Sequence, residues 1–298
     1  GDQEEEKTLS HEKYIKRNSD GTYDITLNAS GTVGTHTDKA LVDIVLLVDT
    51  LFSMKDNDNI KNAKAAIKKM VEGFNAKDTV DVRYRLVTFG TDAKIQTEWV
   101  DGNTVNGKVE KISIKDKQGT NYDKGFQKAK DALRGARNGA SKIVVFLTDG
   151  NPTYYGDAEG FGDRTSEKTL NTAYDSAKDI TCDQFYAVGI SLDTVHIYYG
   201  WGGYKESTDG LTILQNIKNK TNNESGVAVG DAWDLGDSTE LSEKFESIVG
   251  TITTLACENV EISDTLSEYV KVTDNSKLRV KIAQKNSNGS FISKYDQE

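Results

Sequence analysis

The clearest pattern in the chain is an apolar run that ends in a carboxylate. Six of the seven residues from Val42 to Val48 are apolar, and Asp49 follows directly. Such a run is typical of a strand buried on both faces of a parallel sheet. Ser141–Thr148 repeats the pattern and is followed by Asp149. If the two strands are parallel neighbours, both carboxylates emerge at the sheet edge where open α/β sheets bind ligands.

Helical and extended patterns alternate along the middle of the chain. Apolar residues at helical spacing predict helices over residues 56–76, 105–112, 122–137, 166–180, 211–219 and 238–254. Short apolar or alternating runs predict further strands over residues 83–89, 93–100, 184–190 and 227–235, the second being an edge hairpin with the first. This alternation predicts an α/β fold, doubly wound, with a mostly parallel sheet and right-handed crossovers.

The two ends of the chain show a different, antiparallel β pattern. Residues 11–33 predict a strand, a turn and a second strand, and residues 260–262, 269–272, 278–282 and 290–292 predict short alternating strands. A lone hairpin is marginal in water, which favours pairing of the two ends over two unstructured tails. We therefore expect residues 1–37 and 256–298 to form one smaller antiparallel β-sandwich, with the α/β domain inserted at residues 38–255.

Composition and charge narrow the classes of function. The chain has 37 Lys and Arg against 47 Asp and Glu, a net charge of −10. It therefore lacks the basic field that a nucleic-acid partner requires. No apolar run approaches the roughly 20 residues that span a bilayer, so we expect no membrane span in this chain. No catalytic-triad pattern, HExxH helix or phosphate loop is present, so we expect no enzyme.

Hydroxyl side chains accompany the two carboxylates. Ser53 lies shortly after Asp49, and Thr120 precedes the helix expected at residues 122–137. Oxygen ligands that converge without cysteine or histidine suit Mg²⁺, Mn²⁺ or Ca²⁺. The alternative interpretation is that Asp49, Ser53 and Thr120 cap the helices that follow them.

With these residues the chain resembles the von Willebrand factor A domain over about residues 42–255. That family carries a metal-ion-dependent adhesion site (MIDAS), written Asp-x-Ser-x-Ser after the first strand, a Thr in a later loop and an Asp after a later strand. The matching residues are Asp49, Ser53, Thr120 and Asp149. The resemblance implies that the two hydroxyls bind the metal directly and that the two carboxylates act largely through water.

Two residues depart from the family pattern. Leu51 stands where the family has its first ligand serine, and Phe52 stands where a glycine is common. A leucine cannot ligate Mg²⁺. The resemblance therefore implies Mg²⁺, or else Mn²⁺ or Ca²⁺, as a cofactor that Leu51 leaves weakly bound or absent.

Two aromatic, glycine-rich segments, residues 153–164 and 193–204, are expected as loops on the same face. Aromatic side chains offer contact area at a low entropic cost, as at paratopes, and they also stack on sugars. The candidate ligand-binding residues are Phe52, Tyr154, Tyr155, Phe161, Tyr198, Tyr199, Trp201 and Tyr204. The alternative is that these long loops pack on themselves.

The chain has two cysteines, Cys182 and Cys257. Cys182 precedes the strand at residues 184–190 and Cys257 follows the last helix, so both belong at the pole opposite the candidate metal site. A disulfide between them and two unrelated buried thiols are both compatible with this placement. A bridge would indicate an oxidising, extracellular setting.

The β segments on both sides of the α/β domain resemble those of tip adhesins of Gram-positive pili and related wall-anchored proteins. The resemblance implies a secreted, cell-wall-anchored surface protein that binds a host extracellular protein or glycan, with other pilus subunits as further partners. The alternative is a structural pilus or cell-wall spacer with a degenerate, metal-free site. Such sandwiches often carry an isopeptide bond, for which Asp264 with Lys13 or Lys16 are candidates, unless Asp264 simply starts a turn.

Overall fold

The chain divides into two compact units. One holds Ala40–Ala256, and the other holds Gly1–Lys39 together with Cys257–Glu298. The computed structural model describes residues 9–31, 39–114, 118–199, 203–223, 226–257, 280–285 and 291–297. The two ends of the chain therefore belong to one unit, and the middle of the chain to the other.

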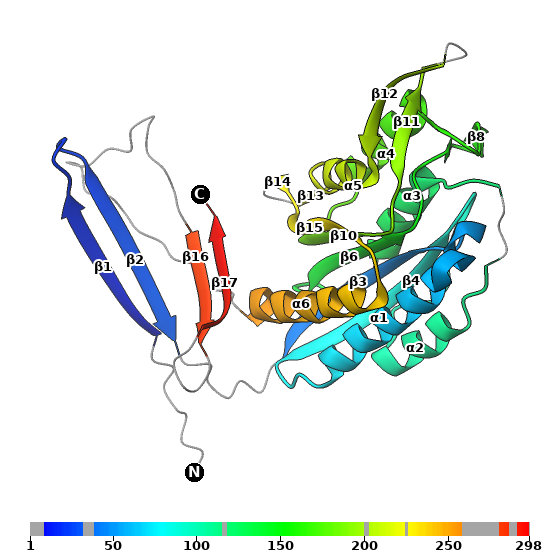
Figure 1. Ribbon diagram of the computed structural model, residues 1–298. Helices are drawn as coiled ribbons and strands as arrows, with labels where there is room; N and C mark the ends of the chain where they lie inside the picture. Colours follow the sequence, from blue (N-terminus) through cyan, green and yellow to red (C-terminus); the bar gives the residue numbers. More distant parts are fainter. Residues whose placement is uncertain are drawn as a thin grey trace. The chain divides into compact units, whose positions relative to one another are not determined.

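A six-stranded sheet runs through the larger unit in the order β15-β10-β6-β3-β4-β5 (Figure 1). These strands are β3 (Ala40–Asp49), β4 (Val80–Phe89), β5 (Ala93–Ile95), β6 (Ser141–Thr148), β10 (Gln184–Ile190) and β15 (Val229–Leu235). Every neighbouring pair is parallel except β4 with β5. The two apolar runs are direct neighbours, with Val48 of β3 opposite Leu147 of β6. The predicted doubly wound α/β fold is confirmed.

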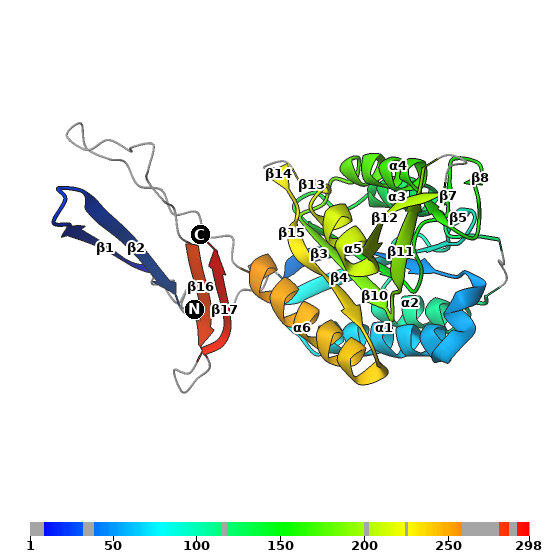
Figure 2. The ribbon, with the colours of Figure 1, turned by 45° about the horizontal axis from the view of Figure 1, so that its top comes forward.

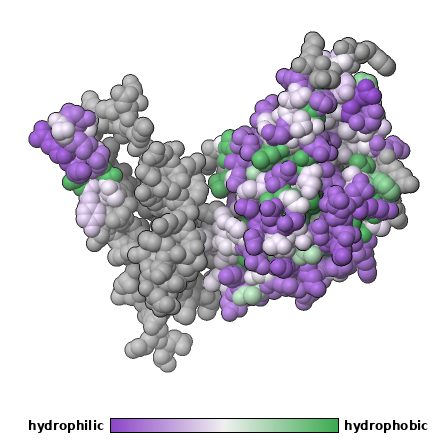
Figure 3. Space-filling model, viewed as in Figure 1, coloured by the Kyte–Doolittle hydropathy of each residue, from purple (hydrophilic) through white to green (hydrophobic). Residues whose placement is uncertain are grey.

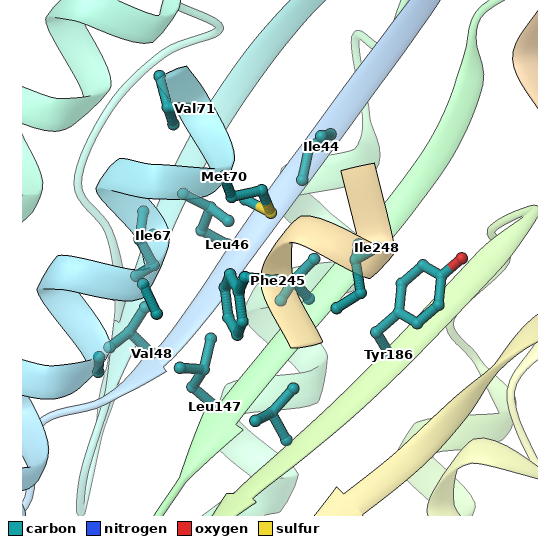
Figure 4. Packing of buried hydrophobic residues seen from close by; sticks show 14 of the residues in the cluster. Ile44, Leu46, Val48, Ile67, Met70, Val71, Leu147, Tyr186, Phe245 and Ile248 are labelled. Carbon is teal, nitrogen blue, oxygen red and sulfur yellow. The ribbon is translucent and has the colours of Figure 1, made fainter. Parts of the chain in front are cut away.

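Helices cover both faces of this sheet (Figures 1 and 2). The first face carries α1 (Asn59–Asn75), α2 (Gly102–Glu110) and α6 (Ser238–Cys257). The second face carries α3 (Tyr122–Leu133), α4 (Glu167–Lys178) and α5 (Gly210–Lys218). Because side chains alternate along a strand, β3 sends Leu46 to the first face and Leu47 to the second. Figure 4 shows side chains of α1 and α6, including Met70 and Phe245, lying together over the first face.

One of the two cysteines, Cys182, lies in the core of the larger unit. Cys182 is a free, buried thiol in the structure, so the expected Cys182–Cys257 bridge is wrong for it. Cys182 packs in the cluster on the second face, whereas α6, which ends at Cys257, packs on the first. The side chain of Cys257 lies outside the described residues.

The first helix begins later than its apolar periodicity predicts. A 3₁₀ segment, η1 (Phe52–Asp58), precedes α1, and its last two residues, Asn57 and Asp58, adopt left-handed φ values of 50° and 59°. Asn and Asp tolerate this conformation better than other non-glycine residues. The irregular turn sets α1 back to Asn59 and places that residue beside the candidate site.

A buried ion cluster fixes the opposite pole, at the amino ends of the strands. Asp43 is fully buried on β3 and accepts hydrogen bonds from Arg83 Nη2 at 2.7 Å, and from Arg137 Nε at 2.9 Å and its backbone N at 2.6 Å. Burial opposes ionisation of Asp43, but the bonds from the two arginines outweigh it, so the pKa is lowered. Arg137 also pairs with Asp81 at 2.8 Å.

Short strands lie outside the main sheet of the larger unit. They are β7 (Tyr154–Tyr155), β8 (Glu159–Gly160), β9 (Thr165–Ser166), β11 (Thr194–Tyr198), β12 (Tyr204–Asp209), β13 (Asn222–Asn223) and β14 (Gly226–Val227). The expectation of a loop at residues 193–204 is therefore wrong. β11 pairs antiparallel with β12 and parallel with β9, and it buries Val195 and Ile197 between exposed neighbours.

The second unit holds two antiparallel hairpins. β1 (Leu9–Arg17) pairs with β2 (Tyr23–Gly31), and β16 (Val280–Lys285) pairs with β17 (Phe291–Gln297). The strands expected at 260–262 and 269–272, and Asp264, lie outside the described residues. Lys13 and Lys16 are exposed on β1, so neither has the burial that an isopeptide-forming amine needs. The β-sandwich stays a prediction.

The surface of the larger unit is mainly hydrophilic in the view of Figure 3, with apolar residues in small patches. No described helix has the length and apolar character required to cross a bilayer. The large apolar side chains lie instead in the two clusters that flank the sheet.

Candidate functional site

Asp49 and Asp149 lie at the same edge of the sheet. Asp49 is the last residue of β3, and Asp149 follows β6 directly. Because β3 and β6 are parallel neighbours, their carboxyl ends bring the two acidic residues together. The structure therefore places both carboxylates where the sequence predicts them.

Asp49 is fully buried and is held by groups of its own chain. Its Oδ1 accepts a hydrogen bond from the backbone N of Leu51 at 2.8 Å, and its Oδ2 accepts one from Thr148 Oγ1 at 2.7 Å. Burial, and then the charge of Asp149, raise the pKa of Asp49 to about 7 against the opposing effect of these bonds. The carboxylate does not cap α1, because Asp58 occupies that position.

Asp149 is bound through both of its oxygens. Ser53 Oγ donates to Oδ1 at 2.8 Å, and Asn59 Nδ2 donates to Oδ2 at 3.1 Å. Burial raises the pKa of Asp149, although both hydrogen bonds favour its ionised form. Ser53 lies in η1, the segment after β3, and its hydrogen bond thus connects that segment to the end of β6.

Thr120 completes the set from a third segment. Its Oγ1 lies 3.4 Å from the point that a Cβ would occupy at Gly150, beside Asp149. Thr120 is buried and does not cap α3, because Asn121 accepts the capping bond from the backbone N of Lys124. The capping interpretation of Thr120 is therefore wrong. All four expected site residues gather at one pole.

The donor set suits a hard divalent cation through hydroxyl and carboxylate oxygens. The described residues include no group of three or more His, Cys, Asp or Glu side chains able to hold a metal. A cation here would therefore depend on Ser53 and Thr120 as well as on the two carboxylates. Leu51 contributes only its backbone N–H, so the chain offers one oxygen fewer than the family pattern.

The Thr120 segment is joined directly to the aromatic hairpin β7–β8. The backbone N of Thr120 donates to Thr153 Oγ1 at 2.9 Å, and its carbonyl oxygen accepts from the backbone N of Thr153 at 2.8 Å and of Tyr154 at 3.0 Å. Asn121 Nδ2 also donates to the carbonyl of Gly156 at 3.1 Å. Because of these hydrogen bonds, a movement of the β7–β8 hairpin would also move the segment that carries the Thr120 hydroxyl.

Cationic side chains lie over several of the expected ligand-binding aromatics. Arg164 has its guanidinium carbon 5.4 Å from the Phe161 ring centroid and 5.0 Å from that of Tyr198. Lys55 lies over Phe52 at 4.8 Å and Lys168 over Tyr155 at 5.7 Å. Lysine and arginine side chains of the same chain thus pack on these rings, as the self-packing interpretation predicts. Phe52 and Phe161 nevertheless remain 41% and 38% exposed.

The remaining expected aromatics are placed differently. Tyr199 donates its hydroxyl to Glu206 at 2.7 Å across the β11–β12 hairpin. Tyr204 begins β12, but its side chain lies outside the described residues, as does all of Trp201.

Two site residues were missed in the sequence. Asn59 is buried on the apolar face of α1, one turn before Ala63 and two before Ile67. A polar residue at that helical position was the available signal. Thr148 ends an otherwise apolar stretch of β6, and its hydroxyl reaches Asp49.

The von Willebrand factor type A domain model matches residues 43–194, a little over half of the chain. The chain belongs to this family. None of the curated proteins matches its sequence.

Solved structures share the fold at low sequence identity. A von Willebrand factor type A protein from Catenulispora acidiphila matches with a TM-score of 0.54 and 14% identity over 84% of this chain and 51% of that one. PilB minor pilin from Streptococcus sanguinis matches at 0.56 and 13%, over 84% and 79%. The pilus adhesin SpaC from Lactobacillus rhamnosus GG matches at 0.52 and 18%, over 82% and 34%. The chain thus spans about half of the first of these proteins and a third of SpaC.

Proposed function

We propose that this chain is an extracellular adhesion module that captures a host protein or glycan through the carboxyl-end face of its sheet. The observation that carries the proposal is the convergence of Asp49, Ser53, Thr120 and Asp149 on one pole. The hydrogen bonds from Thr120 to the β7–β8 hairpin join this oxygen cluster to the half-buried tyrosines Tyr154 and Tyr155.

Each residue has a role that its surroundings support. Ser53 and Thr120 offer hydroxyl oxygens, while Asp49 and Asp149 supply the negative charge that attracts a divalent cation. A bound Mg²⁺ or Mn²⁺ would provide a Lewis-acid position for an acidic group of the partner. Phe161 and Phe52 flank the pole and provide apolar contact area. This role is capture of a partner, and we propose no catalysis.

Fold similarity to SpaC, named as a pilus adhesin, and to PilB, named as a minor pilin, supports a place on the surface of a Gram-positive cell. Identities of 18% and 13% carry the fold alone, so cell-wall anchoring, secretion and contacts with other pilus subunits are part of the proposal. A site that binds a carboxylate through a cation also fits the net charge of −10, which disfavours direct capture of an anion.

A second candidate function is a pilus or wall spacer with a metal-free site. The observation that favours it is the hydrogen bonding of Asp149, whose two oxygens are satisfied by Ser53 and Asn59 without any cation. Leu51 also favours the metal-free spacer, because it supplies no side-chain oxygen to a cation. Cation dependence of binding separates the two functions.

The test is binding of the whole chain to an array of extracellular-matrix proteins and glycans, in Mg²⁺ or Mn²⁺ and in EDTA. Thr120→Val removes the hydroxyl and keeps the side-chain shape. Thr251→Val, on the exposed side of α6, is the matched control. We expect capture that is lost in EDTA and in Thr120→Val and kept in the control. Capture that ignores both changes, or no capture at all, contradicts the proposal and favours the spacer.

A further inference from the structure

Asn59 is a polar side chain in an apolar position. It is 6% exposed at the start of α1, on the face that also carries Ala63 and Ile67, both fully buried. The turn before it holds two left-handed residues, Asn57 and Asp58. The irregular turn thus places a largely buried amide at the start of α1.

The amide of Asn59 faces the candidate cation site. Its Nδ2 donates to Asp149 Oδ2 at 3.1 Å, while Ser53 Oγ donates to the other oxygen of the same carboxylate at 2.8 Å. Across the residues that the structure describes, Oδ1 of Asn59 accepts no hydrogen bond. One half of the amide is therefore committed to Asp149, and the other half is available.

The available Oδ1 of Asn59 lies in a site that lacks one oxygen of the family pattern, the serine hydroxyl at position 51. At position 51 the chain has leucine, whose only polar contribution is the backbone N–H that Asp49 Oδ1 accepts at 2.8 Å. A carboxamide is both donor and acceptor, and a half-turn about its last bond exchanges the two groups. Asn59 can therefore act as a donor to Asp149 or as an oxygen toward a cation that Asp149 holds.

We propose that Asn59 takes over the place of the missing serine, presenting Oδ1 to a divalent cation at the Asp49–Asp149 pole. Without a cation, the amide donates to Asp149 and neutralises part of its charge. With a cation, the amide turns and its oxygen joins the coordination shell, directly or through water. Asn59 is thus a ligand of the cation or of its bound water, and this inference rests on the cation-dependent capture proposed above.

The two possible roles of Asn59 predict different effects of its replacement. If the amide serves only as a donor to Asp149, Asn59→Ala and Asn59→Asp both lose that hydrogen bond and both weaken Mn²⁺ binding by roughly tenfold or more, the range seen when hydrogen-bond partners of metal ligands are removed. If the amide supplies an oxygen, Asn59→Ala weakens Mn²⁺ binding and Asn59→Asp, which keeps an oxygen, does not. The comparison of the two substitutions therefore decides between the roles.

The experiment is calorimetric titration of the whole metal-free chain with Mn²⁺ alone. The variants are Asn59→Ala, Leu51→Ser and their combination, with Asn62→Ala one turn further along α1 as the matched control. Asn59→Asp keeps an oxygen at the position and provides a second readout if the alanine variant folds poorly. Thermal unfolding in EDTA shows whether each variant is folded.

We expect Asn59→Ala to lose affinity, Asn59→Asp to bind at least as well as the wild type, and Leu51→Ser to restore the alanine variant. The control should match the wild type. Unchanged binding by Asn59→Ala, binding by Asn59→Asp as weak as that of Asn59→Ala, no rescue by serine, or no Mn²⁺ binding by the wild type would overturn the inference. Because the titration contains no partner, intact Mn²⁺ binding with failed capture on the array would count against the proposed function alone.

Discussion

Replacing Asp49 with asparagine removes one of the two carboxylates at the carboxyl end of the sheet. We expect the metal-free protein to become more stable at neutral and alkaline pH, although a native hydrogen-bonding group is altered. The asparagine Oδ1 can still accept the backbone N–H of Leu51, and its Nδ2 can donate to Thr148 Oγ1. Thr148 can then send its own proton to the carbonyl of Gly150, 3.1 Å away.

The magnitude follows from the pKa of Asp49. Burial and the charge of Asp149 raise it from 3.8 to about 7. A carboxyl whose pKa is raised on folding favours the folded state when protonated, and that contribution is lost as pH rises through about 7. At about 1.4 kcal/mol per pH unit, the ionised group costs at most about 4 kcal/mol above that pH. The advantage of asparagine should therefore grow by about 3 kcal/mol between roughly pH 5 and pH 8.

The assay is urea unfolding of both proteins in EDTA across this pH range. Asp43→Asn is the matched control, because Asp43 is a fully buried aspartate on the same strand with a lowered pKa. Removing its carboxylate leaves Arg83 and Arg137 without their partner and should destabilise the protein by about 3–5 kcal/mol at neutral pH. Equal destabilisation by the two substitutions, with no dependence on pH for Asp49→Asn, would refute the electrostatic reasoning.

Three further predictions test other parts of the structure. Gly230→Ala should lower the free energy of unfolding by more than about 1 kcal/mol, because φ at this residue is 133° and a Cβ would lie 2.0 Å from the carbonyl oxygen of Phe185. An unchanged free energy of unfolding in urea would contradict the register of β15 against β10. Cys182, a free buried thiol whose pKa burial raises, should resist alkylation until the chain unfolds, and native labelling seen by mass spectrometry would contradict its placement. Thr153→Val removes the acceptor of the Thr120 N–H and should speed amide exchange in the β7–β8 hairpin, which unchanged exchange would disprove.

The sheet was predictable because its central strands are buried on both faces. β6 and β10 begin and end at the residues expected, since apolar runs of that kind have sharp polar limits. The start of α1 was not predictable in the same way. The helix was expected from Asp56, but Asp56 is extended with ψ 142° and Asn57 and Asp58 are left-handed, so α1 begins only at Asn59. Backbone strain of this kind leaves no trace in hydrophobic periodicity.

The candidate site was predictable where it depends on strand ends. Parallel neighbours place Asp49 and Asp149 together whatever the loops do. The contacts of Asn59 depend instead on how an irregular turn is wound, and pattern alone does not give that. The β11–β12 hairpin was missed because glycine and aromatic composition hid the alternation of Val195 and Ile197.

The most direct test of the account is an anomalous-scattering measurement on crystals of the whole chain grown with Mn²⁺. We expect one strong manganese peak within coordination distance of Ser53 Oγ and Thr120 Oγ1, beside Asp49 and Asp149. We also expect the Asn59 amide to have turned from its position against Asp149. A structure with that pole free of manganese, and with the hydrogen bonds of Ser53 and Asn59 to Asp149 intact, would contradict the cation-dependent site.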